Sequence, residues 1–192
     1  MPDMASRNEV KEDLPDSAFH VYNRGVEYRQ IFMDGFDYRR FINQLRAALQ
    51  EEPSVTLLVY CLMPDHFHLM LQQTDSGAVS RVMHRLGIAY VRYFNHKYRR
   101  VGTLYQGRYK ARRIVGAKDM MDTSAYIHLN PERAGLGWRQ QAYSSVKYYR
   151  PPFKADGFVN PWPVLTLFDF PSDYSGFLST RQLRLPPKTS TR

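Results

Sequence analysis

The segment from residue 55 to residue 72 constrains the fold of this chain more than any other segment. Val55–Met63 is a nearly continuous apolar run rich in Val and Leu, which is typical of a buried strand. Pro64–Asp65 then predicts a turn, and His66–Gln72 predicts a second strand that pairs back on the first. The other elements must therefore be arranged around a buried β-hairpin.

The elements on either side of this hairpin are predicted from hydrophobic spacing and from start and stop signals. They are a strand at Phe19–Asn23, a helix over about 35–51 capped by Asp34, a helix at Val79–Tyr98, a strand within Leu104–Val115, a helix at Asp119–Leu129 ended by Asn130–Pro131, and a short helix at Tyr143–Tyr149. The first six elements, hairpin strands included, follow the order βαββαβ. This order predicts an α+β fold with a ferredoxin-like sheet and an added helix.

Composition excludes several other classes of protein. A length of 192 residues predicts one domain, and 43% hydrophobic with 14% aromatic residues excludes a mostly disordered chain. The single cysteine, Cys61, excludes a disulfide framework and a Cys-based zinc finger. No apolar run approaches the roughly 20 residues of a membrane helix, and the polar first fourteen residues do not resemble a signal peptide. We therefore expect a soluble, cytoplasmic protein without membrane contact.

Positive charge is concentrated in one window of the sequence. The net charge is +9, but residues 76–118 hold eleven Lys and Arg and no acidic residue, which leaves the rest of the chain at −2. Aromatic residues interleave with these cations: Tyr90, Tyr93, Phe94, Tyr98, Tyr105 and Tyr109. Cations that neutralise phosphates beside rings that stack on bases favour a single-stranded or hairpin nucleic acid. The alternative is a solvated basic helix whose rings point into the core.

Two histidines open the second hairpin strand. Because alternate residues of a strand share a face, His66 and His68 should point one way and Phe67 the other way, into the core. Such a pair can chelate one divalent metal, and a third ligand from elsewhere with open positions would make the site catalytic. The alternative is two half-exposed histidines on a sheet face. Asp65 next to them is interpreted chiefly as a turn residue.

A second set of polar residues ends the helix predicted at 119–129. Tyr126 and Asn130 are spaced i, i+4 and should share a helix face. A tyrosine hydroxyl can be a covalent nucleophile when a metal or a base assists it, and Asn130 could supply an oxygen ligand. The alternative is a packing role, since Tyr126 is one of 14 tyrosines. His128 falls on a different face, where packing or solvent exposure is expected.

Four motifs occur in a fixed order: FHVYNRG at 19–25, MPDHFHL at 63–69, YQGRYK at 105–110 and YIHLNPERAG at 126–135. Together they closely resemble the single-tyrosine HUH transposases of the IS200-like class, including the REP-associated tyrosine transposases. The resemblance covers about residues 18–150. It implies a transposase domain there, after a polar leader at 1–17 and before a Pro- and aromatic-rich tail at 151–192, which is either disordered or a strap over the core.

The resemblance also implies the chemistry of the site. His66, His68 and Asn130 match the ligands of Mg²⁺ or Mn²⁺, and Tyr126 matches the nucleophile carried by the added helix. The implied enzyme is a metal-dependent endonuclease and strand transferase. It cuts single-stranded, hairpin-bearing DNA, leaves a 5′-phosphotyrosine and a free 3′-OH, and rejoins the strand during DNA transposition. Relatives act as dimers or as monomers, so a homodimer is allowed.

Candidate DNA contacts come from the basic window and the motifs. They are Arg24, Arg81, Arg85, Arg92, Arg99, Arg100, Gln106, Arg108, Lys110, Arg112 and Arg113. Two other functions stay open. One is a nucleic-acid-binding module on the same fold that has lost its chemistry, and the other is a metal hydrolase acting on a small substrate, which the +11 window disfavours.

Overall fold

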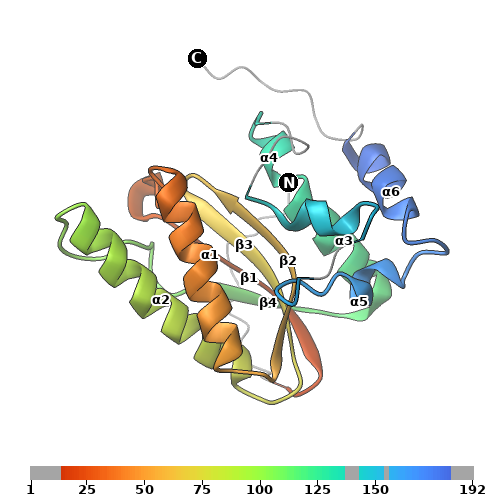
Figure 1. Ribbon diagram of the computed structural model, residues 1–192, viewed down its shortest axis with the longest axis horizontal. Helices are drawn as coiled ribbons and strands as arrows, with labels where there is room; N and C mark the ends of the chain where they lie inside the picture. Colours follow the sequence, from red (N-terminus) through yellow and green to blue (C-terminus); the bar gives the residue numbers. More distant parts are fainter. Residues whose placement is uncertain (1–13, 137–142, 154–155, 183–192) are drawn as a thin grey trace.

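The computed structural model describes residues 14–136, 143–153 and 156–182. Its centre is a four-stranded antiparallel sheet in the order β2-β3-β1-β4 (Figure 1). The strands are β1 (Ser17–Arg24), β2 (Val55–Met63), β3 (His66–Gln73) and β4 (Lys110–Ile114). This order and the helices between the strands confirm the predicted ferredoxin-like fold.

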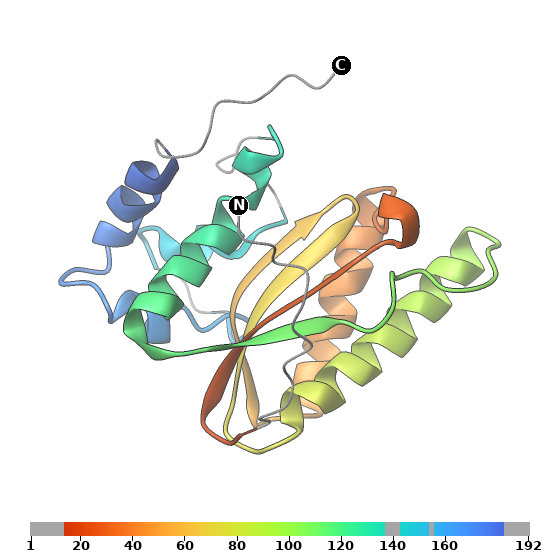
Figure 2. The ribbon, with the colours of Figure 1, turned by 180° about the vertical axis from the view of Figure 1, so that it is seen from behind.

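Helices lie on both faces of the sheet (Figures 1 and 2). They are α1 (Gly35–Gln50), α2 (Ala78–Lys97), α3 (Gly116–His128), α4 (Asn130–Arg133), α5 (Trp162–Leu165) and α6 (Asp173–Gln182), with the short 3-10 helices η1 (Val26–Tyr28) and η2 (Ser145–Tyr149). The helices α1 and α2 pack together over one face, and α3 lies against the other face with α5 and α6 beside it. Within the described ranges, no helix is long and apolar enough to span a membrane.

The strand β2 is buried at every position except Thr56, as its apolar run predicts. Both faces are covered, since α1 packs on one side and α3 and η2 pack on the other. Its outer edge is also covered, because Leu62 N–H donates to the carbonyl of Tyr143 and Asn160 N–H donates to the carbonyl of Leu57. A chain segment far along the sequence therefore satisfies the backbone groups that an edge strand would expose.

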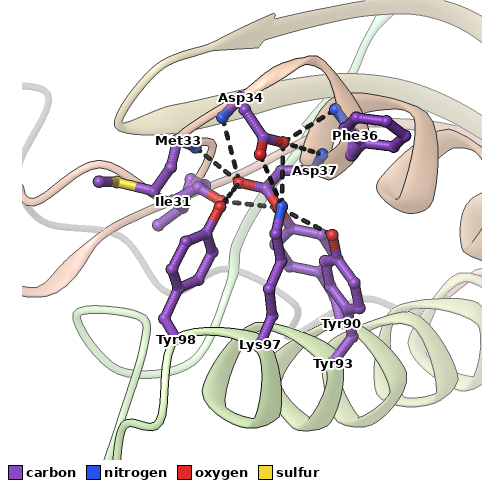
Figure 3. Close-up of polar contacts among 9 residues, drawn as sticks. All are labelled: Ile31, Met33, Asp34, Phe36, Asp37, Tyr90, Tyr93, Lys97 and Tyr98. Atoms are coloured by element: carbon purple, nitrogen blue, oxygen red, sulfur yellow. Dashed lines mark hydrogen bonds and ion pairs between the residues drawn. The ribbon is translucent and has the colours of Figure 1, made fainter.

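The helix α1 begins as predicted, with Asp34 as its N-cap. The Asp34 carboxylate accepts hydrogen bonds from Phe36 N–H and Asp37 N–H, and Asp37 accepts in return from Asp34 N–H. The Asp37 carboxylate is fully buried and also accepts from Lys97 Nζ at 2.7 Å, Tyr93 Oη at 2.8 Å and Tyr98 Oη at 2.7 Å (Figure 3). One carboxylate thus joins the start of α1 to the end of α2.

Residues 156–182 form a strap over the sheet and α3. Six apolar side chains of this segment are buried: Phe158, Val159, Val164, Leu165, Tyr174 and Leu178. The buried ring of His128 forms hydrogen bonds of 2.7 Å to the Tyr174 hydroxyl and to Ser145 Oγ. His128 is therefore a packing residue that ties α3 to α6 and η2.

Three predicted elements start two or more residues away from where the structure starts them. The helix α3 starts at Gly116 rather than Asp119, because the Asp119 carboxylate accepts from Val115 N–H and so caps an earlier start. The short helix predicted at 143–149 is the 3-10 helix η2, which Ser144 caps. The strand β1 starts at Ser17, the last residue of the predicted leader, and residues 1–13 of that leader lie outside the described residues.

Candidate active site

The candidate site lies on the sheet face that α3 covers. In the pairing of β1 with β3, Tyr22 lies directly opposite His68. Alternate residues of a strand share a face, so His20 and Tyr22 lie on the same sheet face as His66 and His68. Phe67 points the other way and packs against Phe41 of α1, with ring centroids 5.1 Å apart. The predicted common direction of the two histidines is confirmed.

His66 has a partner on each ring nitrogen. Its Nδ1 lies 2.6 Å from Oδ1 of Asp65, and its Nε2 lies 3.2 Å from Oδ1 of Asn130. An ionised carboxylate only accepts, so Nδ1 of His66 carries a proton, and in the neutral ring Nε2 then has its lone pair on the side of Asn130. Asp65 therefore orients His66 in addition to forming the turn, which the interpretation as a turn residue left out.

His68 is more deeply buried than His66, and its Nδ1 lies 2.9 Å from Nε2 of His20. Burial lowers the pKa of His68 well below its ordinary value, and the neighbouring charges of His20 and His66 act in the same direction. Burial also lowers the pKa of His20 to about 3, with a further contribution from Arg112. Both rings are thus neutral near pH 7, which is the form of imidazole that binds metals.

Tyr126 of α3 reaches the same sheet face. Its ring meets the rings of His20 and His68 edge-on, with centroids 5.7 and 5.6 Å apart. On this half-buried ring the guanidinium of Arg133 lies 4.7 Å from the centroid. The arrangement brings a phenol, two imidazoles and a cation together, although Tyr126 and His68 are far apart in the sequence.

Asn130 reaches His66 across a break between two helices. The helix α3 ends at His128, and Asn130 is the first residue of α4, where Pro131 fills an N-terminal position that needs no N–H donor. Asn130 Nδ2 is buried without a hydrogen-bond partner, whereas Oδ1 faces His66 Nε2. The expected convergence of Tyr126 and Asn130 on one site is found, although the two residues lie in different helices.

The donor atoms fit a divalent cation held by two histidines and an amide. Within the described part of the chain, no three His, Cys, Asp or Glu side chains form a metal-binding group. The amide of Asn130 is the side chain beside His66 that could serve as a third ligand. In the neutral form of His66 with its proton on Nδ1, Nε2 of His66 and Oδ1 of Asn130 both offer a lone pair, 3.2 Å apart. Two such atoms side by side could bind the same cation.

Three of the candidate DNA contacts lie on the site face. Arg24 is the cross-strand partner of His66, and Lys110 is the partner of Tyr22. Arg112 lies two residues further along β4 and donates to the Asp119 carboxylate at 2.7 and 2.9 Å. Among the candidate DNA contacts, the cations nearest the site therefore come from β1 and β4.

The remaining candidate contacts are placed elsewhere. Arg81, Arg85 and Arg92 belong to α2 on the opposite face of the sheet, and Arg99 and Arg100 follow the end of α2. Gln106 and Arg108 are exposed in the loop before β4. Arg113 of β4 is the cross-strand partner of Phe19 of β1. Arg81 and Arg85 also form ion pairs with Glu52. The sheet therefore divides the basic window into two surfaces, which its continuity in the sequence did not indicate.

Sequence reasoning assigned no role to three residues that contact the site: His20, Tyr22 and Arg133. His20 and Tyr22 have the same i, i+2 spacing as His66 and His68. This spacing could have placed His20 and Tyr22 together on one face of their strand. Arg133 lies seven residues after Tyr126, a spacing that would put both on one face of a single uninterrupted helix. The first signal could be used only with the knowledge that β1 pairs with β3. The second could be used only with the knowledge that α4 follows α3 after a single residue.

The fold and the site together define a class of protein: a ferredoxin-like domain of the HUH type, in which a His-x-His strand faces a tyrosine on an added helix. The chain belongs to the IS200-like transposase family, whose family model matches residues 16–130. No curated protein matches the sequence.

Solved structures include similar folds. A REP-associated tyrosine transposase bound to a REP hairpin is 16% identical to this chain, with a TM-score of 0.61 over 77% of this chain and 85% of that chain. A candidate transposase from Deinococcus radiodurans R1 is 19% identical, with a TM-score of 0.43 over 57% of this chain and 87% of that chain. The first likeness supports the fold.

Proposed function

We propose that this chain cuts and rejoins single-stranded, hairpin-bearing DNA through a covalent bond to Tyr126. The observation that carries the proposal is the position of the Tyr126 ring, which meets His68 on the sheet face where His66 meets Asn130. A phenol beside a set of metal-binding donors is what phosphoryl transfer to a tyrosine requires. Membership of the transposase family supports the same conclusion.

In the proposed reaction, the hydroxyl oxygen of Tyr126 attacks a backbone phosphorus, and the bond from that phosphorus to the 3′ oxygen breaks. The phenol loses its proton and the leaving 3′ oxygen gains one, so a free 3′-OH results. The 5′ side stays on the protein as a phosphotyrosine diester. Because a 3′-OH can attack this diester in turn, joining needs no ATP.

His66, His68 and Asn130 would hold Mg²⁺ or Mn²⁺ in this proposal. A bound divalent cation polarises a phosphoryl oxygen and offsets the charge that grows in the transition state. Imidazole favours softer metals than Mg²⁺, so Mn²⁺ is the better probe in vitro. Asp65 contributes by holding the ring of His66 through its Nδ1 proton.

The DNA would enter along the cations on the site face. In the sheet, Arg24 lies across from His66 and Lys110 lies across from Tyr22, where they can neutralise phosphates that flank the scissile one. The ring of Tyr28 is 68% exposed and has the Arg24 guanidinium 4.6 Å from its centroid, which leaves one face open to a base. Hairpin DNA as the partner is supported by the REP-hairpin complex of the similar structure.

The test is an adduct assay with labelled single-stranded hairpin oligonucleotides and Mn²⁺. We expect an SDS-resistant protein–DNA adduct with the native chain and none with Tyr126→Phe or His66→Ala. Tyr148→Phe is the matched control, because Tyr148 lies in η2 and donates to Asp156 away from the site. Its adduct should match that of the native chain.

Each result has a separate meaning. An adduct formed by Tyr126→Phe would refute the nucleophile, and cleavage by His66→Ala would refute the metal site. Binding without any adduct across a broad oligonucleotide pool would refute the enzyme and favour a module that only binds hairpins. A flat dependence of affinity on salt would refute the assigned phosphate contacts.

A further inference from the structure

The side chain of His20 is 4% exposed and contacts both proposed kinds of functional residue. Its Nε2 lies 2.9 Å from Nδ1 of His68, and its ring meets the Tyr126 ring edge-on. In the sheet ladder His20 is paired with Met70, so it is the diagonal neighbour of His68 on one face. The mechanism proposed above gives this buried imidazole no role.

The hydrogen bond between the two rings can be made in two ways. Two neutral imidazoles share one proton in such a contact, so one ring donates and the other accepts. If His68 donates from Nδ1, its Nε2 is a free lone pair on the side away from His20. If His20 donates from Nε2, then His68 carries its own proton on Nε2 and has no lone pair left for a cation.

We propose that His20 is a positioning residue whose Nε2 accepts a hydrogen bond from Nδ1–H of His68 and thereby holds the Nε2 lone pair of His68 ready for the metal. This inference rests on the proposed function, because it assumes that His68 is a ligand. The other proposed ligand has a matching partner, since Asp65 accepts a hydrogen bond from Nδ1–H of His66 at 2.6 Å. Partners of this kind fix the ring orientation and the tautomer of metal-binding histidines.

The two partners differ in a way that has consequences. The ionised carboxylate of Asp65 can only accept a hydrogen bond, so it keeps a proton on Nδ1 of His66. His20 is a ring in a tightly packed cluster, with Tyr22 and His68 centroids each 5.1 Å from it. It therefore fixes His68 both by a hydrogen bond and by contact, and a test must separate these two effects.

Two substitutions separate the hydrogen bond from the packing. His20→Phe keeps an aromatic ring but cannot accept a hydrogen bond. His20→Gln can accept one through its amide oxygen. We expect His20→Phe to bind Mn²⁺ about 10- to 100-fold more weakly than the native chain, measured by calorimetry without DNA, and His20→Gln to restore most of the affinity. Tyr148→Phe, in η2 away from the site, is the control, and its affinity should be native.

A second measurement needs no metal. Nitrogen-15 NMR of the metal-free protein should find His68 as the Nδ1–H tautomer in the native chain and in His20→Gln, and should find the Nε2–H tautomer populated in His20→Phe. Thermal unfolding of each variant shows whether the fold is kept. Native Mn²⁺ affinity in a folded His20→Phe, or an Nε2–H tautomer of His68 in the native chain, would overturn the inference.

The failure of the proposed function would give a different result. In that case the native chain would bind no Mn²⁺, or His66→Ala would bind it normally, while the tautomer of His68 would still be decided by NMR. If the native chain binds Mn²⁺ through His66 and both His20 variants behave alike, the inference about His20 fails and the metal site stands.

Discussion

Asp37→Asn should be among the more destabilising single changes in this fold, although Asp37 lies far from the candidate site. The buried carboxylate accepts hydrogen bonds from Met33 N–H at 2.7 Å, from two tyrosine hydroxyls and from Lys97 Nζ at 2.7 Å (Figure 3). An asparagine of the same size offers one accepting oxygen, and its NH₂ group would face donors. At least one hydroxyl or the Lys97 ammonium would lose its partner.

The magnitude follows from burial and from what Lys97 retains. Removing one member of a buried charge pair costs about 3–5 kcal/mol, because the other charge stays without compensation. Lys97 is 28% exposed and keeps Asp34 at 2.8 Å, so the low end applies. We expect the free energy of unfolding to fall by about 3 kcal/mol, which corresponds to roughly 6–12 °C in Tm for a chain of this size.

The pH dependence of this loss supplies a second check. Burial by itself would raise the pKa of Asp37, but the hydrogen bonds from Lys97, Tyr98, Met33 and Tyr93 outweigh it and hold the pKa below its ordinary value of 3.8. A carboxylate with a lowered folded pKa stabilises above its unfolded pKa, and this stabilisation is lost as the pH falls through the folded pKa. The difference between native chain and variant should therefore be full at neutral pH and shrink below about pH 4.

The assay is urea unfolding of native and variant chains between pH 3 and pH 7, followed by circular dichroism. Glu27→Gln is the control, because Glu27 pairs with Arg29 on the surface with both side chains more than half exposed. Its unfolding should be native within error. A loss below 1 kcal/mol for Asp37→Asn at pH 7, or a loss that does not change with pH, would refute this account.

Three further predictions concern other surfaces and contacts. Tyr28→Ala should weaken binding of single-stranded DNA by roughly 1–3 kcal/mol in a fluorescence titration; the equally exposed Phe170→Ala should not, and equal losses would remove the stacking argument. Tyr174→Phe should lower the free energy of unfolding by about 1–3 kcal/mol, since it leaves a buried histidine nitrogen without its partner; unchanged urea unfolding would contradict this. Lys110→Ala should reduce the slope of log affinity against log salt by about 1, whereas Lys147→Ala in η2 should leave it unchanged.

Much of the fold could be read from local patterns. The buried hairpin followed from one apolar run and a Pro–Asp turn, because a strand without polar alternation must be covered on both faces. The start of α1 followed from Asp34, since a cap acts within a few residues. The common face of His66 and His68 followed from the period of a strand. These are all short-range properties, and the sequence contains them completely.

The C-terminal strap and its contacts could not be read in this way. Residues 156–182 lack clear periodicity, yet they bury apolar side chains against α3 and supply Tyr174 to the ring of His128. Short helices with few apolar positions give a weak signal, because their burial depends on a surface that only the folded domain provides.

The distribution of charge shows the same limit. The sequence by itself determined that eleven cations follow the histidine strand within the acid-free window 76–118. Only the tertiary structure decided that α2 carries some of them to the far face of the sheet, while Lys110 and Arg112 stay on the face of Tyr126. Only the tertiary structure brought His20 to His68, because strand pairing joins residues 48 positions apart and no local pattern specifies such a contact.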